Sequence, residues 1–457
     1  MKSNLRDLNI YLSTLSQSII KDGDFAYSVV PCIQNDILNY INKEKNKNSQ
    51  RSLIEIIKTH ISMLALVLIS ILSVVLCIIK RPKFGIYSVD IIKGRYFSDP
   101  RITGVYEYLK SQHRDANFIE FVHSVVARDT FYKILKRRRP VIYLEAIDYI
   151  ASIFIKSSYI KIIDPDLRDL ELRLFTIRLR IKILSFVFSI IGVKTILMID
   201  DFRIFQSFVI ASKLSRLKSV AFQHGRFSQY IEHLRYEGID LKKCATPDKT
   251  IAWNGFWRNA LFDLYPVYDL NKESVVVGGS PRSSRDFFSD IDFKQNQDKT
   301  RVSTLSLLFV YEPHSLVYAR EVIDRIKMSP EMTVLLKLRP DIDKSKQIAD
   351  LGLSDSDKFK ILSDWKEIIE QADLVVGTYS TFLYECVGFG LPVIGINCPK
   401  LEIDDLVSYG VAIKLDADQI NYKYLSSSIE ELRSRVSNSK SLFKYDKLNY
   451  SIMDSIL

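Results

Sequence analysis

The sequence predicts an α/β protein with two doubly wound, Rossmann-like domains that face a cleft. Two observations predict this fold. Short apolar runs alternate with helical spans, and most of these runs end in a polar or glycine-rich turn. A charged stretch poor in apolar residues, 283–301, then separates the runs into two sets. We expect the following organisation: a helical N-terminal region at 1–82, an acceptor-side domain at 83–285, a linker at 286–300, a donor domain at 301–423 and C-terminal helices at 424–457.

Composition limits the class of partner. The chain has 457 residues and a formal net charge of +10, which predicts an acidic partner such as a nucleotide or a phospholipid surface. No helix-turn-helix, zinc-finger or RNP-type pattern stands out, so we do not expect nucleic acid. The five cysteines are scattered and include no CxxC pair. This pattern predicts a reducing compartment with neither a disulfide framework nor a zinc site.

The N-terminal region contains one strongly apolar segment. The run Ile61–Ile79 carries no charge, and Lys80, Arg81 and Lys83 follow it. As a helix it would be about 28 Å long, close to the ~30 Å thickness of a bilayer core. Three interpretations are open: a spanning helix, a helix lying in the membrane interface, and a buried core helix. The basic flank predicts a position on the cytoplasmic face of the cell membrane.

Six apolar runs predict the parallel strands of the first domain, and a helical period covers Tyr106–Leu135 between the first two. The runs are Phe84–Val89, Val141–Leu144, Thr195–Ile199, Ser219–Phe222, Ile251–Trp253 and Val275–Val277. Polar residues follow several of these runs, among them Asp201 and the pair Gln223-His224. Ligand groups of a doubly wound sheet collect beyond the carboxyl ends of its strands. These residues therefore become candidates for a site.

Six further runs predict the second sheet. They are Leu305–Val310, Thr333–Leu338, Phe359–Leu362, Leu374–Val376, Val393–Ile396 and Val411–Leu415. The first two end in polar clusters that contain Glu312, His314 and Arg339. We expect these side chains to lie at the carboxyl edge of the second sheet.

The fourth of these runs opens the most informative unit of the chain. Thr378, Ser380 and Thr381 follow it, and an apolar-periodic helix then stops at Gly388 and Gly390. Hydroxyls and free backbone N–H groups at a helix N-terminus form an anion site. Glu385 follows Thr381 by one helical turn and could accept hydrogen bonds from ribose hydroxyls. The alternative is an ordinary strand–helix turn with a surface glutamate.

Four short motifs, in order, resemble the superfamily of CDP-glycerol glycerophosphotransferases and capsular polysaccharide transferases. They are Gln223-His224-Gly225, Trp253-Asn254-Gly255, Gly278-Gly279-Ser280-Pro281-Arg282 and Thr378–Pro392. The resemblance covers roughly residues 195–397 and implies the GT-B architecture. The sequence departs from the family pattern in one segment, Lys337-Leu338-Arg339-Pro340, where the family has a Lys-Pro-His-Pro-like run.

The resemblance implies a role for several residues. The histidine of the family's His-Gly turn acts as the base, and this role falls on His224. Asp201 could orient it, could itself be the base, or could cap the following helix. We expect leaving-group and donor contacts from Arg282, Arg339, Thr378, Ser380, Thr381 and Glu385, and acceptor or pocket contacts from Gln223, Glu312 and His314. An arginine pair can stabilise a diphosphate without a metal, so no metal and no cofactor are expected.

The expected activity is transfer of a sugar from a nucleotide-activated donor to a surface polysaccharide acceptor of the capsule, O-antigen or cell-wall type. The acceptor would be a glycan or a lipid-linked glycan. Three alternatives remain open. They are transfer of a polyol phosphate from a CDP-polyol donor, nucleotide-sugar 2-epimerisation on the same fold, and a non-catalytic nucleotide-binding subunit. The epimerase alternative predicts a soluble chain without the apolar segment.

Overall fold

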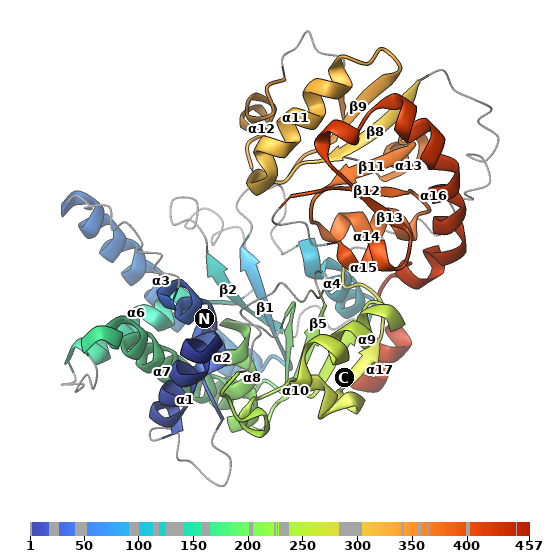
Figure 1. The fold of residues 1–457 in the computed structure, drawn as a ribbon. Coiled ribbons are helices and arrows are strands. Elements are labelled where there is room, and N and C mark those ends of the chain that lie inside the picture. Colours follow the sequence, from blue (N-terminus) through green and yellow to red (C-terminus); the bar gives the residue numbers. More distant parts are fainter. Residues whose placement is uncertain are drawn as a thin grey trace. The chain divides into compact units, whose positions relative to one another are not determined.

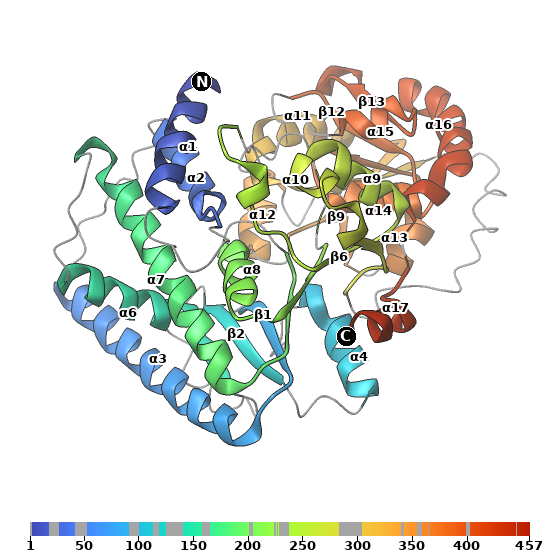
Figure 2. The same cartoon turned by 90° about the horizontal axis from the view of Figure 1, so that it is seen from below.

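The computed structural model describes most of the chain. The described residues are 2–17, 27–41, 53–90, 100–112, 118–124, 140–157, 165–200, 204–223, 225, 227, 237–282, 304–339, 342–353, 359–363, 365–398, 403–444 and 446–457. They form two compact units (Figures 1 and 2). Unit 1 contains 1–253, 257–284 and 447–457, and unit 2 contains 254–256 and 285–446.

Unit 1 is built on a seven-stranded parallel sheet in the order β3-β2-β1-β4-β5-β6-β7. Its strands are β1 (Phe84–Asp90), β2 (Phe118–Ser124), β3 (Val141–Tyr143), β4 (Thr195–Met198), β5 (Lys218–Phe222), β6 (Lys249–Ala252) and β7 (Val275–Val277). Its helices are α1 (Lys2–Gln17), α2 (Val30–Ile41), α3 (Leu53–Lys80), α4 (Thr103–Ser111), α6 (Leu144–Ser157), α7 (Arg168–Ile191), α8 (Ile204–Leu214), α9 (Gly255–Leu264), α10 (Pro266–Asp269) and α17 (Tyr450–Ile456). The first residues of α9 are grouped with unit 2.

Unit 2 has a six-stranded parallel sheet in the order β10-β9-β8-β11-β12-β13. Its strands are β8 (Leu305–Val310), β9 (Met332–Lys337), β10 (Phe359–Ile361), β11 (Leu374–Gly377), β12 (Val393–Ile396) and β13 (Ala412–Leu415). Its helices are α11 (Leu316–Lys327), α12 (Lys344–Asp350), α13 (Trp365–Gln371), α14 (Thr381–Gly388), α15 (Asp404–Ser408) and α16 (Tyr422–Phe443).

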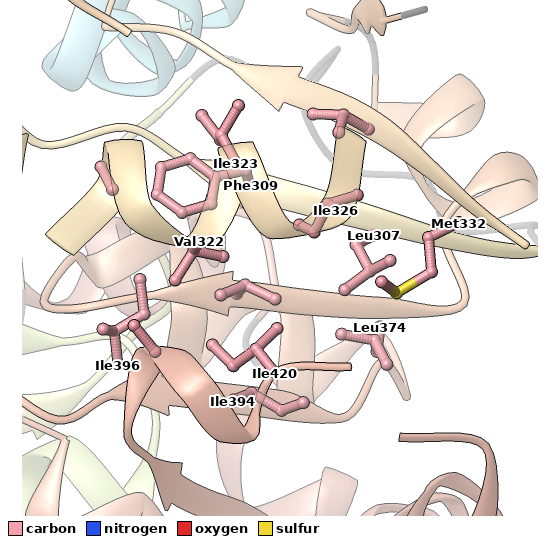
Figure 3. Close-up of a cluster of buried hydrophobic side chains, with 14 of the residues drawn as sticks. Leu307, Phe309, Val322, Ile323, Ile326, Met332, Leu374, Ile394, Ile396 and Ile420 are labelled. Carbon is pink, nitrogen blue, oxygen red and sulfur yellow. The ribbon is translucent and has the colours of Figure 1, made fainter. Parts of the chain in front are cut away.

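Both strand orders start in the middle of the sheet and wind outward in two directions, which is the doubly wound pattern. The prediction of two doubly wound α/β domains is confirmed. That they face a common cleft stays a prediction. In unit 2 the apolar side chains of β8 and α11 form the centre of the core, with Leu307, Phe309, Val322 and Ile326 almost fully buried (Figure 3).

One predicted element is wrong. Among the residues of Tyr106–Leu135 that the structure describes, the helix ends at Ser111, and Phe118–Ser124 is instead strand β2. This segment, FIEFVHS, lies between β1 and β3 and pairs with both. Its aromatic and β-branched side chains suit a strand that is buried on both faces. The period of the preceding helix therefore does not continue.

The C-terminal helix α17 returns to the first sheet. Leu448 and Met453 are buried in the core of unit 1, and the backbone N–H of Asn449 donates to the carbonyl of Gly278 at 2.8 Å. The chain thus leaves unit 1 near residue 284 and re-enters it at Lys447.

Helix α3 covers the open edge of strand β3 in unit 1. The backbone N–H of Tyr143 donates to Ser70 Oγ at 3.0 Å, and that of Val141 donates to Ser73 Oγ at 3.1 Å. Edge strands carry unpaired backbone groups that need a partner or solvent. Two serines in the middle of the apolar segment supply these partners.

Replacing Ser70 with alanine is expected to lower the free energy of unfolding by about 1–3 kcal/mol. The reason is that the buried N–H of Tyr143 would lose its acceptor. Denaturant unfolding of the full chain measures this. Ser189→Ala on α7 is the matched control, because this exposed hydroxyl bonds the carbonyl of Ser185 in its own helix. Equal stability of the two variants would contradict the edge-capping role.

Candidate functional site

The site candidates of unit 2 gather at the point where its strand order reverses. Strands β8 and β11 are neighbours in the sheet, but the chain leaves β8 toward one edge and β11 toward the other. Open parallel sheets bind ligands beyond the carboxyl ends of such a strand pair. Glu312 follows β8, and Thr378 and Ser380 follow β11.

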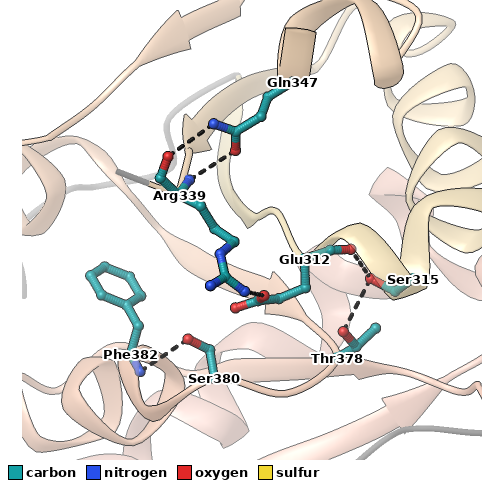
Figure 4. A network of polar contacts seen from close by, with 7 residues as sticks. All are labelled: Glu312, Ser315, Arg339, Gln347, Thr378, Ser380 and Phe382. Carbon is teal, nitrogen blue, oxygen red and sulfur yellow. Dashed lines mark hydrogen bonds and ion pairs between the residues drawn. The ribbon is translucent and has the colours of Figure 1, made fainter. Parts of the chain in front are cut away.

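Hydrogen bonds join the turns that follow these two strands (Figure 4). Thr378 is buried, and its hydroxyl donates to Ser315 Oγ at 3.2 Å. Ser315 Oγ in turn donates to the carbonyl of Glu312 at 2.9 Å. Ser380 is the N-cap of α14, and its hydroxyl accepts from the backbone N–H of Phe382 at 3.3 Å. The helix therefore begins at the predicted polar turn.

Arg339, two residues after the end of β9, completes this edge. Its Nη1 donates to Glu312 Oε2 at 3.1 Å (Figure 4). The side chain of Glu312 is 9% exposed and that of Arg339 is 36% exposed. The carboxylate is thus held inside while the guanidinium remains partly open to solvent. A guanidinium in this setting can form two parallel hydrogen bonds with a phosphate.

Gln347 of α12 fixes the backbone that carries Arg339. Its Oε1 accepts from the N–H of Arg339, and its Nε2 donates to the carbonyls of Arg339 and Ile342, each at 2.9 Å. Gln347 is fully buried. The position of the Arg339 Cα is therefore set by a side chain from a different element.

Glu385 lies inside unit 2 on α14, with 3% of its surface exposed. Burial, and next the charge of Glu385, raise the pKa of the neighbouring Cys386 thiol well above its ordinary value. The alternative of a surface glutamate is therefore wrong. Buried carboxylates require hydrogen-bond partners or cations. The direct ribose contact stays a prediction.

Two contributors were not predicted. Ser315 joins the two turns, as described above. Lys337 ends β9, and its Nζ lies 5.5 Å from the centroid of the Phe382 ring in α14. The sequence signal for Lys337 is its position near the end of a predicted strand, two residues before Arg339. This edge thus has a second cation.

His314 and Thr381 complete the predicted set in unit 2. His314 lies in the short turn Pro313–Ser315 directly after Glu312, and its side chain is outside the described residues. Thr381 is the first residue of α14 and is partly exposed. Their predicted donor and pocket contacts stay predictions.

In unit 1, Gln223 is engaged in the fold. Its Oε1 accepts from the Trp253 N–H at 2.9 Å, its carbonyl accepts from Trp253 Nε1 at 2.7 Å, and its Nε2 donates to the carbonyl of Gly225 at 2.7 Å. Gln223 is 3% exposed. Its side chain therefore bonds to Trp253 and Gly225, and acceptor contact stays a prediction.

Arg282 lies beside the same tryptophan, with its guanidinium carbon 5.4 Å from the Trp253 ring centroid. The structure brings Arg282 and Gln223 together around Trp253 in unit 1, while Arg339, Glu312, Thr378 and Ser380 lie together in unit 2. His224 and Asp201 lie outside the described residues. Within the described part of the chain, no group of three His, Cys, Asp or Glu residues could hold a metal ion.

No protein-family model and no curated protein matches the sequence. Solved structures do give matches. A UDP-GlcNAc 2-epimerase from Neisseria meningitidis, bound to UDP-GlcNAc, is 12% identical with a TM-score of 0.48 over 81% of this chain and 98% of that one. Spinosyn rhamnosyltransferase SpnG is 8% identical with a TM-score of 0.46, and the match covers 82% of this chain and 99% of that one. Anabaena HepE in complex with UDP is 14% identical with a TM-score of 0.42, and the match covers 82% of this chain and 97% of that one. With TM-scores below 0.5, the fold assignment comes from the strand order of the two sheets.

Proposed function

We propose that the chain is a transferase that takes a sugar from a nucleotide-activated donor bound to unit 2. One observation carries the proposal. The turns after β8 and β11 meet at the strand-order reversal of a parallel sheet, and they present a capped helix N-terminus beside Arg339. This combination suits a diphosphate, because it supplies N–H donors, hydroxyls and a guanidinium at one edge.

The chemistry of this proposal has two parts. The bond between the anomeric carbon and the diphosphate oxygen breaks, and the negative charge that develops on the nucleotide is stabilised by Arg339 and the hydroxyl turn. The acceptor hydroxyl loses its proton to His224 and forms the new bond to the anomeric carbon. Arg282 is a further candidate for diphosphate contact, and Asp201 is a candidate for orienting the base. We propose no metal and no cofactor for this reaction.

We further propose that the acceptor is a growing surface glycan, free or lipid-linked, at the cytoplasmic face of the cell membrane. The order of the four sequence motifs supports this choice of acceptor. Transfer of a polyol phosphate from a CDP-polyol donor is the second candidate, since the same motifs carry it. The exposed apolar face of α3 (described below) favours either transferase over the soluble 2-epimerase.

Donor binding by the full chain is the direct test. Titration with UDP-, GDP-, CMP- and CDP-activated donors is expected to reveal one preferred nucleotide. Glu385→Gln is expected to weaken its binding by roughly 10- to 100-fold, because hydrogen bonds to a charged group contribute about 1.5–3 kcal/mol. Glu321→Gln on α11 is the control, since this exposed carboxylate pairs with Arg325 in its own helix. If no activated donor binds, the proposal fails.

A further inference from the structure

Helix α3 has two opposite apolar faces in unit 1. Leu66, Ser70, Ser73 and Cys77 are all buried and recur at the spacing of one helical stripe, which packs on β3 and α6. The side chains on the other face are large, apolar and exposed. They are Ile57, Ile61, Leu64, Leu68, Ile71, Leu72, Val75, Leu76, Ile78 and Ile79. At 100° per residue, this second face is centred opposite the buried stripe.

The exposed face is too long and too apolar to be an ordinary solvent face. Thr59–Lys80 is the one helix in the described part of the chain that is long and apolar enough to cross a membrane. Leu68 and Leu72 are each 62% exposed. Exposed apolar patches of this kind mark contact with a membrane or a partner. The wholly buried core helix is therefore excluded.

The buried stripe argues against a helix that crosses the bilayer. Ser70 is the midpoint of Ile61–Ile79, and its hydroxyl accepts the N–H of Tyr143 on the sheet edge. A crossing helix would place this sheet edge at the centre of the bilayer. No water is present there for the polar groups of a folded domain. The two ends of α3 must then lie on the same side of the membrane.

We propose that α3 lies in the plane of an anionic membrane surface, with its outward face embedded and its buried stripe holding unit 1. Charge complementarity selects this occupant. Lys80, Arg81 and Lys83 are exposed directly at the end of the apolar face, where they can meet acidic headgroups. An in-plane helix buries its apolar face at the boundary of headgroups and acyl chains.

The neighbouring helix extends the apolar surface. Helix α6 packs beside α3 (Figure 2), and His60 Nδ1 lies 3.2 Å from the hydroxyl of Tyr149 between them. Ile153 and Phe154 of α6 are also exposed, at 49% and 57%. The proposal concerns attachment alone, so its test needs neither donor nor turnover and can fail independently of the proposed function.

Binding to vesicles tests the embedded face. The full chain is expected to float with vesicles of phosphatidylcholine and phosphatidylglycerol. The double variant Leu68→Glu, Leu72→Glu is expected to lose this binding by at least roughly 100-fold, because two carboxylates would enter the apolar layer. The control is Leu270→Glu with Met328→Glu, two apolar side chains with exposures of 62% and 85% that lie outside α3. Circular dichroism confirms that both variants fold.

The basic flank is tested separately. Lys80→Ala, Arg81→Ala and Lys83→Ala together are expected to weaken binding to anionic vesicles by roughly 10-fold or more, and high salt should weaken binding of the parent chain in the same way. Binding that is equally strong to pure phosphatidylcholine would overturn the choice of an anionic surface.

The same-side arrangement is tested by labelling. Two variants each carry one new cysteine beside the apolar segment, Thr59→Cys or Lys83→Cys. Both also carry Cys398→Ser, because Cys398 is partly exposed whereas the other native cysteines are buried. In sealed vesicles from expressing cells, a membrane-impermeant maleimide is expected to label both positions from one side. Labelling from opposite sides would establish a spanning helix and overturn the proposal. A different outcome is that the parent chain fails to bind vesicles and forms a dimer that the double variant Leu68→Glu, Leu72→Glu dissociates. That result would assign the exposed face of α3 to a second copy of the chain, and it would also overturn the proposal.

Discussion

Replacing His224 with alanine is expected to lower turnover by about 10²–10⁴-fold while leaving donor binding within a few-fold of the parent. General base catalysis contributes on this scale, and the histidine of the proposed reaction acts on the acceptor hydroxyl. Gln223, which precedes it in the chain, accepts a hydrogen bond from the Trp253 N–H and donates one to the carbonyl of Gly225. Steady-state turnover and donor titration on the same samples measure the two effects.

The pH profile separates a base from a structural histidine. An unperturbed imidazole titrates near ~6.5, and a base must be neutral to accept the proton. The kcat/KM of the parent is therefore expected to fall about tenfold per pH unit below that pKa, and this fall should be absent from the residual activity of His224→Ala. His60→Ala is the control, since this exposed histidine lies beside Tyr149. An unchanged profile in His224→Ala would remove His224 from the mechanism and leave Asp201 as the candidate.

Replacing Arg339 with alanine is expected to weaken donor binding by roughly 10- to 100-fold. Without the guanidinium, the diphosphate would lose its charge-assisted hydrogen bonds, which contribute about 1.5–3 kcal/mol. Arg339→Lys should recover only part of the affinity, because an ammonium cannot form the two parallel bonds. Calorimetric titration of the full chain with the preferred donor measures this. Arg325→Ala, in an exposed pair with Glu321, is the control.

Replacing Glu312 with glutamine is expected to change the donor affinity in the opposite direction. In the structure Arg339 is bonded to the Glu312 carboxylate, so a diphosphate must compete with that carboxylate for the guanidinium. Neutralising Glu312 removes both the competitor and a like charge near the anion. The variant is therefore expected to bind donor a few-fold more tightly. Weaker binding by Glu312→Gln, together with unchanged binding by Arg339→Ala, would show that this ion pair is purely structural.

The sequence alone determined the two parallel sheets and most of their strands. A buried strand is a short apolar run, and the polar turn after it is a local feature, so both are readable without long-range information. The turn at Thr378–Thr381 and the start of α14 were found in this way. The prediction that Tyr106–Leu135 is helical was wrong because the buried position of β2 between two strands is not a local property.

Only the tertiary structure decided which groups meet. The partner of Arg339 is Glu312 in the turn after β8, and the backbone of Arg339 is fixed by Gln347. The apolar run Ile61–Ile79 allowed a spanning, an interfacial and a buried helix alike. The proposal of an in-plane helix rests on Ser70 and Tyr143, which are distant in sequence but hydrogen-bonded in the fold. Periodicity records how residues repeat along one element, whereas pairing and burial depend on which elements pack together.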